Sequence, residues 1–193
     1  MHVFDLTPAV RISTLAALLV ASVGCQQSGK PDNSAAIAEH RERLLLTAEP
    51  ADAQTPLDLR EAAEGFEAGP VVLVGQIGGM PNPWAGVEKN FPWVNGEATF
   101  FLVDPATAAE FADHAPEDPD HAANCPFCAR AAQQSVDAMA TVTFLDATGE
   151  PIAITASELF DVDAEDVVVI QGNARLLAEK QLFVEAEGIY IRR

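Results

Sequence analysis

Residues 166–191 read DVVVIQGNARLLAEKQLFVEAEGIYI, two apolar stretches joined by a short polar link. Both stretches are rich in β-branched and apolar residues, and apolar and polar residues alternate over 170–176 and again over 184–187, which is the period of a half-buried β-strand. The link at 178–181 is short enough for an antiparallel hairpin. Gly172 interrupts the first stretch, and a glycine within a strand often marks a bend or bulge. These residues therefore predict a strongly curved β-hairpin.

Three more strands precede this hairpin, and one helix separates them from it. Period-two segments lie at 71–78, which contains Gly75 at a second expected bend, at 98–104 and at 140–146. A capping box, Thr-Ala-Ser-Glu at 155–158, begins the helix. The order strand, strand, strand, helix, strand, strand is that of the OB-fold, a five-stranded partly open barrel. We therefore expect a mainly β fold with α additions, a five-stranded OB-like barrel; another small antiparallel barrel or a sandwich is the alternative.

Helix-forming residues come before the barrel. Residues 35–48 are rich in helix formers, and 56–64 begin with proline after a threonine, a helix start signal. They predict a helical N-terminal segment over 35–69. Since all five strands lie within 70–193, we expect this OB-like domain to fold without the segment.

A long insert separates the second and third strands. Residues 105–138 are more than a plain hairpin connection needs, which favours a functional role. Asp104 followed by Pro105 is a cap and first-turn pair, and it predicts a helix over 106–112. A second helix is expected to carry the segment from Cys125 onward, with Asn124 as its N-cap.

The apolar run at 12–23, ISTLAALLVASV, follows Arg11 and is followed directly by Gly24 and Cys25. It is too short to cross a bilayer as a helix, which takes about 20 residues, and it has the length of a secretory signal core. Its end resembles the lipobox of bacterial lipoproteins, where a small residue precedes a cysteine that becomes lipidated. We therefore expect a signal peptide at 1–24, an acylated Cys25 and a flexible tether over 25–34. An ordinary secretion signal or a short retained anchor is the alternative.

Composition excludes several classes of partner. The chain has 29 acidic and 11 basic residues, a formal charge of −18. Nucleic acids and anionic lipid surfaces both require clustered Lys and Arg, so neither is an expected partner. Attachment to a membrane of the bacterial cell envelope is therefore expected to depend on the N-terminal lipid. The sequence contains no Walker, GxSxG, GxGxxG or HExxH motif, so no enzyme class is indicated.

Metal-ligating residue types are concentrated in the insert. The spacing is His114-x6-His121-x3-Cys125-x2-Cys128. Two thiolates and two imidazoles suit tetrahedral Zn²⁺, and Cu(I) accepts the same ligands. We therefore predict a binding module that holds one such ion. A local disulfide is one alternative. A thiol–disulfide oxidoreductase is another, although the segment before CPFC lacks the strand that a thioredoxin-like motif requires.

Three aromatic residues lie in the loop between the first two strands, Trp84, Phe91 and Trp93. In OB-folds this loop borders the ligand face, so these rings are candidate ligand-face aromatics. The favoured interpretation is that they fill the end of the barrel or pack against the N-terminal helices, because large aromatics mainly supply buried area.

Several segments resemble a family of bacterial exported lipoproteins that has no assigned activity. They are VVLVGQIGG at 71–79, NPW at 82–84, ATFFLVDP at 98–105, NCPFC at 124–128 and GIYIRR at 188–193. The resemblance implies export and a lipid anchor. It transfers no catalytic residue.

Overall fold

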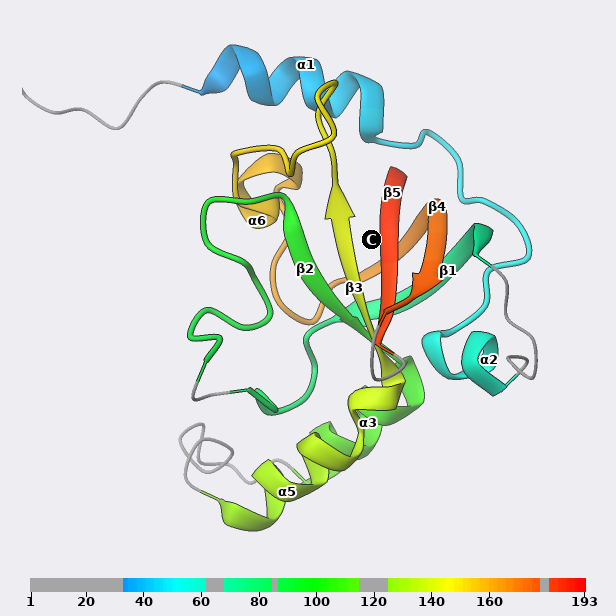
Figure 1. The fold of residues 1–193 in the computed structure, drawn as a ribbon, viewed down its shortest axis with the longest axis vertical. Helices are drawn as coiled ribbons and strands as arrows, with labels where there is room; N and C mark the ends of the chain where they lie inside the picture. Colours follow the sequence, from blue (N-terminus) through cyan, green and yellow to red (C-terminus); the bar gives the residue numbers. More distant parts are fainter. Residues whose placement is uncertain (1–32, 62–67, 85–86, 115–124, 178–180) are drawn as a thin grey trace, which may run out of the picture. The chain divides into compact units, whose positions relative to one another are not determined.

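Five strands and six helical segments make up the computed structural model of the chain, which describes residues 33–61, 68–84, 87–114, 125–177 and 181–193 (Figure 1). All of these residues belong to one compact unit. The strands are β1 (Gly69–Ile77), β2 (Thr99–Val103), β3 (Met139–Phe144), β4 (Val167–Leu176) and β5 (Leu182–Ile191). The helices are α1 (Ser34–Leu44), α2 (Pro56–Glu61), α3 (Pro105–His114), α5 (Pro126–Gln134), the 3-10 turn η1 (Val136–Ala138) and α6 (Ala156–Phe160).

The strands close into a barrel in the order β1-β2-β3-β5-β4. Every neighbouring pair is antiparallel except β3 and β5, which run parallel. Helix α6 lies between β3 and β4 in the chain, and α3, α5 and η1 lie between β2 and β3. The predicted OB-like barrel with N-terminal helices and a helical insert is therefore confirmed, and each predicted strand end falls within two residues of the observed one.

Two glycines allow the barrel to curve, as their positions in the sequence predict. The pairing of β4 with β5 shifts register between Gln171 and Gly172. A Cβ atom at Gly172 would lie 2.3 Å from the backbone oxygen of Glu185, and one at Gly75 would lie 2.5 Å from the Leu102 side chain. Both positions therefore exclude any larger residue, because no real Cβ approaches so closely.

The N-terminal segment is part of the barrel core. Leu44 of α1 and Leu59 of α2 are buried in the same apolar cluster as Leu73 and Ile189. Two backbone hydrogen bonds, Leu46 N–H to Ile189 O at 2.8 Å and Gln54 N–H to Val72 O at 2.9 Å, join the segment to β5 and β1. The sequence pattern predicts that residues 70–193 fold without the segment. The structure argues against this prediction, because the segment supplies side chains that fill the barrel, and we expect its removal to destabilise the domain strongly.

The helix cap predicted from the sequence is present at the start of α2 and absent at the start of α6. Thr55 and Asp58 form a reciprocal cap at the start of α2, with Asp58 N–H to Thr55 Oγ1 at 3.2 Å and Thr55 N–H to Asp58 Oδ2 at 3.1 Å. Thr155 precedes α6 as predicted, but its side chain makes no cap bond. Its hydroxyl oxygen instead accepts the Gly96 N–H at 3.1 Å. The capping box predicted at Thr155 is therefore wrong, because a tertiary contact occupies the hydroxyl.

We predict that Leu44→Ala lowers the free energy of unfolding by about 2–5 kcal/mol, the usual cost of removing a buried leucine side chain. Leu44 is only 4% exposed. Urea unfolding followed by tryptophan fluorescence measures the change. The matched control is Glu42→Ala, an exposed position on the same helix. Equal stability of the two variants would show that α1 does not contribute to the core.

Candidate functional site

The insert lies on the outer face of the barrel, where it covers an apolar patch. Ala108 of α3 and Ala132 of α5 are buried in one cluster with Phe101 and Val103 of β2 and with Met139. The cluster is separate from the core inside the barrel. It holds both insert helices against β2, so residues at the start of α5 have a fixed support.

Helix α3 begins where the sequence predicts. Asp104 is 3% exposed, and its Oδ1 accepts the N–H of Ala106 at 2.9 Å and of Thr107 at 3.1 Å. The helix continues to His114. The chain therefore leaves β2 directly into a capped helix.

Helix α5 begins with the two cysteines. Cys125 is its N-cap and Cys128 lies in its first turn, with the Cys128 N–H donating to Cys125 Sγ at 3.2 Å. The cap predicted at Asn124 is wrong by one residue, because the Cys125 sulfur takes the role that an Asn oxygen usually has. Both thiols are free and partly exposed in the structure. The CxxC pair therefore presents two neighbouring sulfurs at a helix N-terminus.

The two thiols have different acidities. A hydrogen bond from the Cys128 thiol, together with the Cys128 backbone N–H, lowers the pKa of Cys125 below its usual value. The same thiol–thiol hydrogen bond raises the pKa of Cys128. Cys125 therefore loses its proton first, and its thiolate is the form that binds soft metals and attacks disulfides.

The structure does not bring the two predicted histidine ligands, His114 and His121, to the thiols within the part of the chain that it describes. His114 is the last residue of α3, whereas His121 lies outside the described part of the chain, as does Cys25. Within the described ranges, no group of three or more His, Cys, Asp or Glu side chains is arranged to hold a metal ion. The four-ligand site stays a prediction.

An apolar cleft next to the thiols was not predicted from the sequence. It has a volume of about 260 Å³ and lies between α3 and α5. Phe127, which lies between the two cysteines in the chain, is part of the lining of this cleft, and 82% of its surface is exposed. The lining residues are Glu110, Phe111, Phe127, Cys128, Ala131 and Ser135. The cleft depends on how two helices pack, a property for which local sequence patterns contain no signal.

The three loop aromatics pack on β2. The ring centroids of Trp84 and Phe91 lie 5.1 Å and 5.4 Å from that of Phe101, and the Trp93 centroid lies 6.0 Å from that of Phe100. Trp84 and Phe91 pack against the outer cluster on β2, and Trp93 packs against the core inside the barrel. The rings therefore supply buried area, as the favoured interpretation expects. Their role at a ligand face stays a prediction.

None of the helices among the described residues is long and apolar enough to span a membrane. The expected lipid anchor at Cys25 lies outside these residues.

We predict that Cys125 is alkylated at a lower pH than Cys128 in the metal-free full chain, since its pKa is the lowered one. Cys128→Ala removes the thiol that donates to Cys125, so the alkylation curve of Cys125 should move to higher pH. Cys125→Ala should move the curve of Cys128 to lower pH, because the partner that raises its pKa is gone. Iodoacetamide labelling at a series of pH values, resolved by peptide mass spectrometry, measures the alkylation curve of each cysteine. Unchanged curves in both variants would contradict the coupling.

Compared with known proteins, the chain matches no protein-family model and no curated protein. A functional conclusion therefore has to come from the fold and from the geometry of the site.

Proposed function

We propose that this protein is a lipid-anchored binding module of the bacterial cell envelope whose insert holds one soft metal ion, Zn²⁺ or Cu(I). The ligands are Cys125, Cys128, His114 and His121, and Cys25 carries the lipid. The observation that supports the proposal best is the pair of free, adjacent thiols at the start of α5.

The arrangement of the thiols suits a metal site. Residues three apart share one face of a helix, so two thiolates can bind the same ion. The amide that donates to Cys125 Sγ and the N-terminal end of α5 both favour the thiolate form, which is the form that coordinates. Two thiolates select soft ions, and added imidazoles complete the tetrahedral set that Zn²⁺ prefers.

The histidines belong to the same short insert. His114 ends α3, and the clustering of Ala108 with Ala132 keeps α3 beside α5. A metal ion joining the end of α3 to the start of α5 would close the connection between the two helices. Coordination then supplies free energy to a segment that has few apolar residues of its own.

A second candidate function is thiol–disulfide exchange, which the exposed Phe127 and the cleft beside Cys128 favour. In this reaction the Cys125 thiolate attacks a disulfide of a partner protein and releases one partner sulfur as a thiol. Cys128 then displaces the other partner sulfur, so the partner is reduced and Cys125 and Cys128 form a disulfide. A permanent Cys125–Cys128 disulfide in an interaction protein is the third candidate.

We predict that protein isolated from the envelope fraction without a histidine tag contains about one equivalent of Zn or Cu, measured by elemental mass spectrometry. Cys125→Ser and Cys128→Ser should abolish binding, since a thiolate is the strongest ligand present. His114→Ala and His121→Ala should weaken it by less. His40→Ala is the matched control, because His40 lies on α1 and not in the insert.

The metal content and the number of free thiols in the same samples distinguish the metal site from the two disulfide alternatives. Metal content that stays the same in both cysteine variants would contradict the metal site. Absence of metal together with a fully oxidised pair would favour the permanent disulfide. A pair that cycles between both redox states with a disulfide substrate would favour exchange.

We predict that Cys25→Ala removes lipid labelling and moves the protein out of the membrane fraction, because the proposed anchor is the acyl group at this residue. Metabolic labelling with an alkyne fatty acid, followed by fractionation, measures both effects. Cys125→Ala is the matched control and should label normally. Labelling of Cys25→Ala at the level of the unchanged protein would contradict the anchor.

A further inference from the structure

A groove lined by both polar and apolar side chains follows the outer side of β3, next to the part of the barrel that the insert covers. Ala140, Val142 and Phe144 face the core, so Thr141 and Thr143 face outward, since side chains alternate along a strand. The groove has a volume of about 370 Å³. Thr99, Thr141 and Thr143 line it together with Leu145, Pro151 and Phe183.

Hydrogen bonds hold the threonine hydroxyls in place. Thr99 Oγ1 donates to Thr143 Oγ1 at 3.1 Å, and these residues are only 6% and 4% exposed. Gln181 Nε2 donates to Thr141 Oγ1 at 3.2 Å. The hydroxyls of Thr99 and Thr143 satisfy each other in the floor of the groove, whereas Thr141 is partly exposed and its hydroxyl can donate to a ligand.

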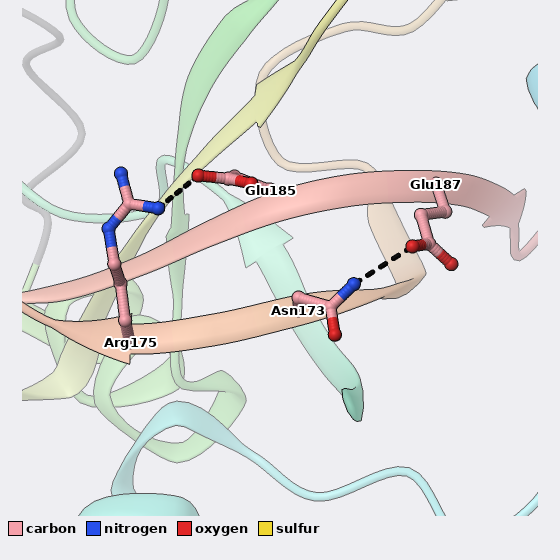
Figure 2. Close-up of polar contacts among 4 residues, drawn as sticks. All are labelled: Asn173, Arg175, Glu185 and Glu187. Carbon is pink, nitrogen blue, oxygen red and sulfur yellow. Dashed lines mark hydrogen bonds and ion pairs between the residues drawn. The ribbon is translucent and has the colours of Figure 1, made fainter. Parts of the chain in front are cut away.

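The charged residues that line the groove are one arginine, Arg175, and two carboxylates, Glu97 and Glu185. Arg175 of β4 pairs with Glu185 of β5, as Figure 2 shows, and the Arg175 guanidinium carbon lies 4.5 Å from the centre of the Phe183 ring. Glu97 adds another carboxylate to the lining. With no excess of positive charge in a chain of net charge −18, an anionic polymer is a poor ligand.

A second hollow continues the groove along the hairpin. It has a volume of about 330 Å³ and shares Leu145 and Glu185 with the first. Asn173 and Glu187 line it as well, joined by a hydrogen bond of 2.8 Å from Asn173 Nδ2 to Glu187 Oε1 (Figure 2). Both volumes fall within the range of small-ligand sites, about 300–1,000 Å³. Two adjacent hollows suit a linear ligand with at least two units.

We propose that this groove binds a neutral oligosaccharide. Sugar hydroxyls donate and accept in turn, which matches the Thr141 hydroxyl, the Arg175–Glu185 pair and the Asn173–Glu187 pair. The C–H faces of sugar rings are apolar and match Leu145, Pro151 and Phe183. The proposal does not depend on the metal site, which lies on the insert.

The test is a titration of the full chain with maltotriose, mannotriose, galactotriose and chitotriose, followed by two-dimensional NMR and calorimetry. At least one of these neutral sugars should shift the amide signals of Thr141, Thr143 and Glu185. Thr141→Val and Glu185→Gln should each weaken its binding by about two- to tenfold, the effect of losing one hydrogen bond. Gln171→Ala is the matched control, an exposed β4 position outside both hollows.

Circular dichroism confirms that each variant is folded before its affinity is measured. Trigalacturonate, an anionic trisaccharide, should bind at least tenfold more weakly than the neutral ligand. Absence of binding by all four neutral sugars, preference for trigalacturonate, or affinities that Thr141→Val and Glu185→Gln leave unchanged would each overturn the proposal.

Discussion

The parallel pairing of β3 with β5 closes the barrel, and both candidate sites depend on this closure. Parallel strands cannot be joined by a tight hairpin, so the chain passes through α6 and β4 before β5 returns beside β3. The passage buries Phe160 of α6 against Phe144, with ring centroids 4.6 Å apart. Closure also makes β2, β3 and β5 adjacent, which creates a continuous outer face with no free strand edge between them.

The side chains of this outer face form two parts, an apolar part that the chain covers and a part that contains the groove. Phe101, Val103 and Met139 are apolar, and the chain covers them with Trp84 and Phe91 of the loop and with α3 and α5. Thr99, Thr141 and Thr143 are polar and line an open groove. The apolar half thus supports the helix that begins at Cys125 and carries Cys128, and the other half contains the groove that we propose as a ligand site. A lipid anchor at Cys25 would hold both sites at a membrane surface.

Sequence patterns correctly predicted the features that depend on interactions between residues close together in the chain. Strand alternation, the cap at Asp104 and the glycines at 75 and 172 all appear in the structure, because each depends on neighbouring residues or on backbone space. Tertiary contacts decided the rest. Leu44 fills the barrel although α1 has only a rough apolar stripe, and the Thr155 hydroxyl bonds to Gly96 instead of capping α6. The groove was not predicted, since its lining comes from separate strands that alternation alone does not bring together.

The metal site is the central functional claim, and X-ray absorption spectroscopy of untagged protein from the envelope fraction tests it most directly. We predict absorption at the Zn or Cu edge. For Zn, sulfur scatterers at about 2.3 Å and nitrogen scatterers at about 2.0–2.1 Å are expected around one ion. The sulfur signal should disappear in Cys125→Ser combined with Cys128→Ser. A first shell of oxygen and nitrogen alone, or a sample in which the two cysteines form a disulfide and no metal is present, would contradict the claim.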